Sequence, residues 1–313
     1  MTDIVGKRRW YFLVSALIII PGLIAMGISL ARYGSPLRLS IDFTGGALLE
    51  LAFERPVSSA EVREIFVARG YTDTTAQNTS DANTVLVRSK DLESTEKATL
   101  EAVLAEEFGP VKELRFAQVG PTVGREVTRS AGIAVAAAAI AIMGFIIFAW
   151  RKVPNAWRYG LCATAATLHD VLVTMGLFSI LGLVLGWEAD SLFLTAMLTV
   201  TGYSVQDTIV VFDRIRENTP KRRGEPYELI VNRSLLETLH RSLATQLNAI
   251  FILVAVLLFG GSNIRQFIAT LLIGLISGTY SSIFTAVPLL VVWEKGEVGA
   301  FFRRLLGRSR ATA

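Results

Sequence analysis

Long apolar runs alternate with short polar segments along most of this chain. Six runs reach the ~20 residues that an α-helix needs to cross ~30 Å of hydrocarbon. They are about Trp10–Leu30, Ala131–Trp150, Trp157–Leu185, Ser191–Phe212, Arg241–Phe259 and Ile264–Trp293. The pattern therefore predicts an α-helical polytopic membrane protein with six transmembrane helices.

The first apolar run follows three basic residues, as the core of a signal peptide does. It is longer than the roughly 7–15 residues of such a core, and Pro21 and Gly22 fall in its middle. We therefore expect an uncleaved first span.

The long polar segment between the first two runs, residues 32–129, alternates between strand and helix patterns. Short β-rich stretches flank two helix patterns that end at Gly70 and Gly109. The order strand, helix, strand, strand, helix, strand is that of a ferredoxin-like split β-α-β fold. We therefore expect one ferredoxin-like α+β domain, large enough to bury its own core.

Lysine and arginine gather beside the apolar runs. They lie before the first run, between the second and third, and after the fourth and sixth, whereas the stretches GWEAD and GGSNIR nearly lack them. The positive-inside rule then places both termini in the cytoplasm and residues 32–129 outside. This distribution accounts for the net charge of +4 and the pI near 9.3 without a nucleic-acid partner.

These patterns divide the chain into four parts. Residues 1–31 form the cytoplasmic N-terminus and first span, 32–129 the extracytoplasmic domain, 130–293 the bundle of the second to sixth spans, and 294–313 a basic cytoplasmic tail. With 52% hydrophobic residues and a mean hydropathy of +0.48, the chain is too apolar for one soluble domain. A single cysteine, Cys162, excludes an intrachain disulfide.

Asp207 is the only formal charge between Leu192 and Phe212. A charge near the middle of a spanning helix costs roughly 2.5–3.5 kcal/mol on insertion scales, so such a residue usually faces a protein interior or a water-filled path. Gln206 adjoins it, and helical spacing predicts that Tyr203 shares its face. Asp207 is therefore the first candidate for intramembrane proton chemistry.

Arg241 is the expected partner of Asp207. Counting helical rise along the fourth and fifth spans places the two charges at similar depth in the membrane. Arg241 also belongs to a stripe of polar residues at spacings of four and three, namely Ser234, Thr238, Arg241, Thr245 and Asn248. The alternative is that Arg241 only extends to the cytoplasmic interface.

Asp170, preceded by His169, is a further intramembrane acid. Its expected depth differs from that of Asp207, so a direct pair is not predicted. We group Asp170, His169, Gln206 and Tyr203 as a possible secondary polar site. The alternative for Asp170 is a structural role, in which its hydrogen bonds tie helices together.

The sequence lacks the usual signatures of hydrolytic enzymes and nucleotide-binding loops. It contains no H-E-x-x-H, no G-x-S-x-G and no Walker A lysine, and neither of its two histidines has a metal-ligand spacing. We expect no enzymatic activity, metal or cofactor. The stretch DFTGG precedes a strand pattern, so it predicts a tight bend, and GLISG predicts close helix packing.

Five ordered motifs resemble the SecF-type branch of the SecD/SecF protein-export family, within the resistance-nodulation-division superfamily. They are IDFTGGALLEL, VGPTVGREVTRSA, TLHDVLVTMG, TGYSVQDTIVVFDRIREN and NRSLLETLHRSLATQL. The fourth departs slightly from the family, which more often has Ile-Asn in place of Val205-Gln206. That change leaves Asp207 in place.

The resemblance implies a function that composition does not. It implies a subunit of the bacterial plasma (inner) membrane that pairs with SecD into a twelve-span unit. That unit would use the proton-motive force to assist export of a preprotein through the SecYEG channel. The family's membrane acid and its arginine partner correspond to Asp207 and Arg241. Two alternatives remain: half of a proton-coupled exporter for a small molecule or lipid, and a non-transporting scaffold of the translocon.

The predicted topology has a direct test. A cysteine at Asn83 should react with an impermeant maleimide added outside, whereas a cysteine at Arg222 should react only after the membrane is permeabilised. Reversed labelling of the two positions would overturn the orientation.

Overall fold

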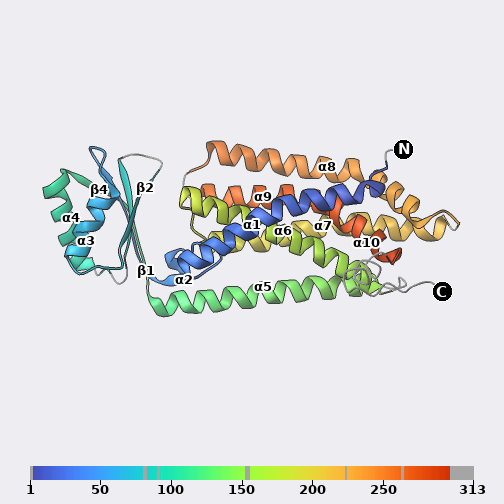
Figure 1. Ribbon diagram of the computed structural model, residues 1–313, viewed down its shortest axis with the longest axis horizontal. Helices are drawn as coiled ribbons and strands as arrows, with labels where there is room; N and C mark the ends of the chain where they lie inside the picture. The colour runs from blue at the N-terminus through green and yellow to red at the C-terminus, as the bar shows by residue number, and fades with distance from the viewer. Residues whose placement is uncertain are drawn as a thin grey trace, which may run out of the picture. The chain divides into compact units, whose positions relative to one another are not determined.

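The computed structural model describes residues 3–79, 83–89, 92, 94–151, 156–222, 224–261 and 264–296. The chain divides into two compact units. One is an α+β unit, Leu39–Ile133, and the other is a helical unit made of the chain up to Arg38 and from Ala134 onward. Their elements are labelled in Figure 1.

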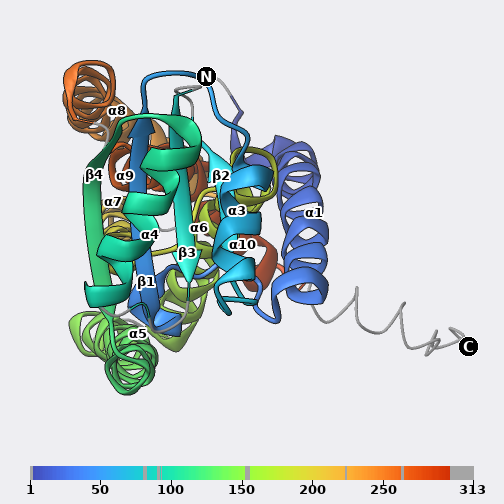
Figure 2. The same ribbon diagram turned by 90° about the vertical axis from the view of Figure 1, so that its left-hand side faces the viewer.

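The α+β unit contains a four-stranded antiparallel sheet in the order β2-β3-β1-β4. Helices α3 and α4 cover one face of this sheet (Figure 2). Its elements are α2 (Ile41–Thr44), β1 (Gly46–Phe53), α3 (Ser59–Ala68), β2 (Thr75–Asn78), β3 (Thr84–Ser89), α4 (Ser94–Phe108) and β4 (Val111–Val119). The predicted ferredoxin-like fold is confirmed.

The core of this unit follows from the alternation of side chains along a strand. Every second residue of β1 is buried, and the same holds for β3. The helices contribute Val62 and Phe66 from α3 and Leu100 and Leu104 from α4. One side of each element is therefore apolar, and those sides meet between the sheet and the two helices.

The Gly45-Gly46 pair forms the predicted tight bend between α2 and β1. Both residues have positive φ, 74° and 116°, a conformation that glycine adopts without steric cost. A Cβ on Gly45 would lie 2.8 Å from the Cα of Pro121, the first residue of α5 (Pro121–Ala149). The Thr128 hydroxyl of α5 donates to the Phe43 carbonyl at 3.2 Å. The bend is thus fastened to the beginning of α5.

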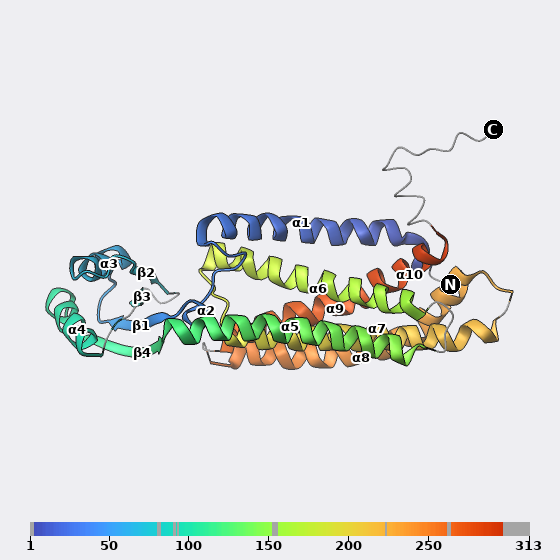
Figure 3. The same ribbon diagram turned by 90° about the horizontal axis from the view of Figure 1, so that it is seen from below.

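The helical unit consists of long helices that run side by side (Figures 1 and 3). Besides α5 they are α1 (Arg8–Tyr33), α6 (Ala156–Leu185), α7 (Ser191–Lys221), α8 (Tyr227–Phe259) and α9 (Arg265–Ser281), which continues through a π-helical segment (Ser282–Ala286) into α10 (Val287–Glu294). Helix α8 begins well before the fifth predicted span, Arg241–Phe259, and continues into it without a break.

Within the described residues, five helices are long and apolar enough to cross a membrane: Val5–Tyr33, Pro121–Ala149, Trp157–Leu185, Tyr227–Phe259 and Arg265–Glu294. The sixth predicted span lies in α7, which has 31 residues and packs against α6, α8 and α9. Polar residues such as Gln206 and Asp207 lower its apolarity. The polytopic α-helical fold class is confirmed.

Small residues bring two helix pairs into close contact. In α1 and α6, a Cβ on Gly22 would lie 2.8 Å from the Gly176 Cα, so the two backbones touch. In α9, Gly274 faces Val200 and Gly278 faces Ser204, both of α7. The packing role predicted for GLISG is thus confirmed.

The bend at Gly45 yields a prediction with a matched control. Gly45→Ala and Gly70→Ala both place a side chain at positive φ, which costs about 1–2 kcal/mol. A Cβ on Gly70 meets nothing within 4 Å, whereas one on Gly45 meets Pro121. Hydrogen exchange in β1 should therefore accelerate more in Gly45→Ala than in Gly70→Ala. Equal acceleration would contradict the close contact with α5.

Candidate functional site

Among the described residues, the helical unit contains two buried carboxylates, which differ in their surroundings. Asp170 of α6 has no exposed surface, and Asp207 of α7 is 6% exposed. Both were found in the sequence as charges inside apolar runs. Because water is absent from the hydrocarbon, the groups that contact each carboxylate decide what it can do.

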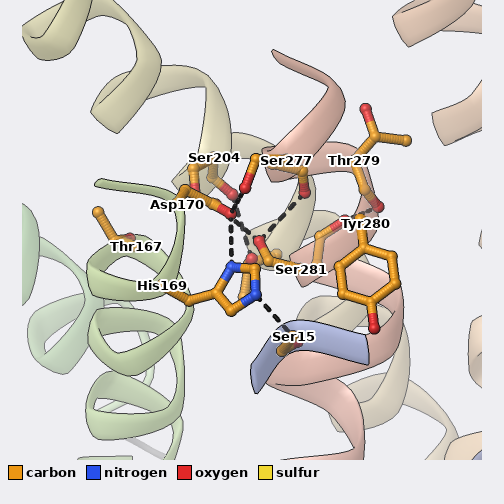
Figure 4. A network of polar contacts seen from close by, with 12 residues as sticks. Ser15, Thr167, His169, Asp170, Ser204, Ser277, Thr279, Tyr280 and Ser281 are labelled. Carbon is orange, nitrogen blue, oxygen red and sulfur yellow. Dashed lines mark hydrogen bonds and ion pairs between the residues drawn. The ribbon is translucent and has the colours of Figure 1, made fainter. Parts of the chain in front are cut away.

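Asp170 accepts hydrogen bonds from four side chains on three helices (Figure 4). On one oxygen the donors are Ser204 of α7 at 2.5 Å and Ser281 of α9 at 2.6 Å. On the other they are Ser277 of α9 at 2.6 Å and His169 Nδ1 at 3.0 Å. Such a set compensates a buried negative charge.

His169 extends this network to α1. Its Nδ1 carries a hydrogen because it faces a carboxylate, and its Nε2 lies 3.0 Å from the Ser15 hydroxyl. Its ring stacks on Tyr280, with centroids 6.0 Å apart, and the Tyr280 hydroxyl donates to the Tyr11 carbonyl at 2.7 Å. The cluster thus joins α1, α6, α7 and α9, as the structural alternative for Asp170 requires.

Asp207 accepts a hydrogen bond from a neutral group. Gln246 Nε2 of α8 donates to its Oδ2 at 2.5 Å. Within the described part of the chain, no ion pair joins Asp207 to a cation. Ser204, which binds Asp170, lies one helical turn before Asp207 on α7, so the two acids occupy neighbouring turns of the bundle.

The expected ion pair between Asp207 and Arg241 is not formed in this structure. The face of α8 that packs against α7 is Ser234, Thr238, Ser242 and Gln246, at spacings of four. Arg241 precedes Ser242 by about 100° of helix rotation, so its side chain leaves that face and is exposed. The polar stripe of the sequence is therefore buried at Ser234 and Thr238 and exposed at Arg241, Thr245 and Asn248, and the functional pair of Asp207 with Arg241 stays a prediction.

The predicted secondary site also separates into two parts. Asp170 and His169 lie together, whereas Gln206 and Tyr203 are exposed on α7, Tyr203 by 48%. The buried face of α7 passes through Ser204, Asp207 and Val211 and leaves Tyr203 on its edge. Tyr203, one helical turn from Asp207, is thus exposed in this chain, and its place in a secondary polar site stays a prediction.

Four residues of these sites were missed from sequence: Gln246, Ser15, Ser277 and Ser281. Ser277 and Ser281 are four residues apart on α9, a spacing that places two hydroxyls on one face. Hydroxyls are common in membrane helices, so that signal is weak without the position of Asp170. No cluster of three or more His, Cys, Asp or Glu that would hold a metal ion occurs among the described residues.

Comparisons with protein families match most of the chain. Residues 99–296 match the family "Protein export membrane protein SecD/SecF, C-terminal", and residues 33–57 match the "SecD/SecF GG Motif", which contains Gly45 and Gly46. A protein translocase subunit SecF of Thermobaculum terrenum is 48% identical over all of both chains. The corresponding subunit of Anaerolinea thermophila is 47% identical over 97% of this chain and 98% of its own.

Solved structures of SecDF share the fold. The crystal structure of SecDF, a translocon-associated membrane protein from Thermus thermophilus, matches 94% of this chain at 32% identity with a TM-score of 0.78. A crystal structure of SecDF in a form called super-membrane-facing matches 97% at 31% identity with a TM-score of 0.65. The chain spans only 39% and 40% of those longer chains.

The Asp170 cluster predicts a large effect on stability. In Asp170→Asn, the side-chain oxygen still accepts hydrogen bonds, but the new NH2 group faces side chains that are themselves donors. The substitution should therefore destabilise the fold by about 3–5 kcal/mol. Asp213→Asn is the control, because Asp213 pairs with Arg216 at 2.7 Å on the surface and should cost at most about 1 kcal/mol. Thermal unfolding of the full chain in detergent measures both. Equal melting temperatures would remove the structural role of Asp170.

Proposed function

The chain belongs to the SecF-type branch of the SecD/SecF family of protein-export membrane proteins, and from this membership we propose that it uses the proton-motive force to assist protein export. In this proposal it pairs with a SecD-like subunit and acts on a preprotein that passes through the SecYEG channel. Its role is in transport, and no enzymatic reaction is assigned to it.

The observation that carries the proposal is the contrast between the two buried acids. Asp170 has four donors and is held as a structural anchor. Asp207 has the neutral amide of Gln246, which leaves its charge weakly compensated. A carboxyl group in such surroundings can take up and release a proton when a nearby charge moves.

Arg241 is the proposed moving charge. It lies five residues from Gln246 on α8, and it keeps its proton at all physiological pH values. An approach of Arg241 to Asp207 would favour the carboxylate, and its retreat would favour the protonated acid. Each charge that crosses 100 mV supplies about 2.3 kcal/mol for such a movement.

A second observation supports a membrane-embedded partner. The outward face of α7 and α8 carries polar side chains in segments that would lie within the hydrocarbon: Tyr203, Gln206, Arg241, Thr245 and Asn248. Polar groups at such depth usually face protein or water rather than lipid. A second helical subunit that covers this face, such as a SecD-like protein, would place Asp207 and Arg241 in a shared interior.

The proposed location is the bacterial plasma membrane, with both termini in the cytoplasm. The basic residues that flank α1 and follow α7 support this orientation through the positive-inside rule. The α+β unit would then lie outside, where it would contact the emerging preprotein.

Asp207→Asn tests the proton-coupled function against a scaffold function. The substitution keeps the shape and removes the charge, so the variant should insert and assemble with its SecD-like partner. It should lose the part of protein export that depends on the proton-motive force, measured in inverted vesicles with and without an uncoupler. Asp73→Asn, an exposed acid of the α+β unit, is the control and should keep that stimulation.

A scaffold gives a different result in the same assay. If Asp207 were only structural, export by Asp207→Asn at matched subunit levels would remain as sensitive to the uncoupler as wild type. The same result would count against the alternative of a proton-coupled exporter for a small molecule. That hypothesis, like proton-coupled protein export, needs Asp207 to take up and release a proton.

A further inference from the structure

A buried row of polar side chains lines the side of α8 that packs against α7. Its members are spaced by four residues and are each less than 9% exposed: Ser234, Thr238, Ser242 and Gln246. The row begins near the cytoplasmic end of the helix pair and ends at Gln246, the donor to Asp207. Beyond Gln246, α8 has no further fully buried residue in its described part.

The hydroxyl of Ser242 differs from the other polar groups of this row. Ser234 donates to the Ile230 carbonyl and accepts from Asn218, and Thr238 donates to its own helix backbone. Ser242 is 4% exposed, and its hydroxyl has no hydrogen-bond partner in the part of the chain that the structure describes. A buried polar atom without a partner calls for an explanation.

The position of Ser242 supplies an explanation for its unpaired hydroxyl. The antiparallel contacts Asp207–Gln246 and Asn218–Ser234 place Ser242 between them, one helical turn from Gln246 and one turn from Thr238. Each step along α8 rises about 6 Å, the distance that one bridging water molecule spans. The Ser242 oxygen is inaccessible to water in this structure, so such a water enters only when α7 and α8 move apart. A hydroxyl at this place can accept one hydrogen bond and donate another.

Thr238 connects the row to a cavity of about 440 Å³ between α7, α8 and the end of α5, where Ala149 and Trp150 line it. Three carboxylates in its lining pair with arginines, in contacts such as Arg214–Glu237 at 2.7 Å and Arg214–Glu217 at 2.8 Å. The charged residues of the lining are Asp213, Arg214, Arg216, Glu217, Glu237 and Arg241. These groups belong to the basic, cytoplasmic end of the proposed topology.

The hydroxyl groups nearest to Asp207 on α7 are already engaged. Ser204 donates to Asp170, and the Thr208 hydroxyl donates to the Ser204 carbonyl. Both would have to break a hydrogen bond before they served Asp207. The Ser242 hydroxyl has none to break.

We infer that Ser242 is the relay through which Asp207 exchanges protons with the cavity at the cytoplasmic end of α7 and α8. The inference rests on the proposed proton-coupled function. In the release step, the Asp207 carboxyl gives its proton to water. That water passes a proton to the Ser242 oxygen as the Ser242 hydroxyl gives its own proton to water on the Thr238 side. Ser242 ends neutral, and one proton reaches the cavity.

The test compares three variants with the wild type, each assembled with its SecD-like partner in inverted vesicles. Ser242→Ala removes the hydroxyl and should slow the stimulation of export by the proton-motive force about a hundredfold, at the low end of measured contributions from proton-transfer groups. Ser242→Thr keeps a hydroxyl and should retain the stimulation. Thr174→Val is the control, because it removes another buried hydroxyl without a partner, on α6.

A proton-transfer readout separates a relay from a packing role. Imidazole is small enough for the cavity and carries protons near neutral pH. With the proton-motive force supplied as a membrane potential, because a permeant base dissipates a pH gradient, it should raise the rate of Ser242→Ala and leave that of wild type unchanged. A variant that is merely misfolded would gain nothing from imidazole. Subunit levels and assembly of every variant are measured in the same vesicles.

Two results would overturn the relay, and both differ from a failure of the proposed function. If Ser242→Ala keeps the wild-type rate while Asp207→Asn loses the stimulation, the proton-coupled function stands and the relay is wrong. If Ser242→Ala is slow but neither Ser242→Thr nor imidazole restores it, Ser242 has a packing role. If Asp207→Asn itself keeps the stimulation, both proposals fail.

Discussion

The structure of the helical unit depends on one constraint: a carboxylate buried among membrane-length helices must receive its hydrogen bonds from protein. Asp170 meets this requirement with donors from α6, α7 and α9, and His169 adds α1 through Ser15. Each of those helices therefore has one rotation and one depth at which its donor reaches the cluster. Close contacts such as Gly22–Gly176 become possible because the helices are already aligned.

Helix α8 is outside that cluster and is fastened differently. Its N-terminal half is held by polar contacts, among them the Asn232 side chain, which accepts from the Ile4 amide at 2.9 Å, and the ion pair of Glu228 with Arg8 at 2.8 Å. Its other half has no fully buried residue in the described part. Asp207 thus lies where a rigid set of helices meets a helix fixed at one end. In this arrangement, a small movement of α8 changes the surroundings of the Asp207 carboxyl.

Sequence patterns were sufficient to predict the structure where similar surroundings recur along one helix or strand. The strand and helix patterns of residues 32–129 predicted the order of elements in the α+β unit, and charges inside apolar runs identified Asp170 and Asp207. They were insufficient where two helices meet, because a polar stripe does not reveal which of its edges faces a neighbour. For that reason the sequence did not show that Arg241 and Tyr203 would be exposed in this chain. The serines around Asp170 come from segments far apart in the chain, so no local pattern identifies them.

The contacts between α1 and α6 have a consequence for how the protein is made. Ser29 of α1 bonds Ser179 of α6 at 3.0 Å, and the two residues are 150 positions apart in the chain. At about 5–20 residues per second, a ribosome reaches the second serine roughly 8–30 s after the first. During that interval the hydroxyls of Ser15 and Ser29 lack their partners on α6. They can donate hydrogen bonds only to backbone carbonyls of α1 itself. Biogenesis therefore includes a period in which the first helix depends on local hydrogen bonds, or on the insertion machinery, until its partner is synthesised.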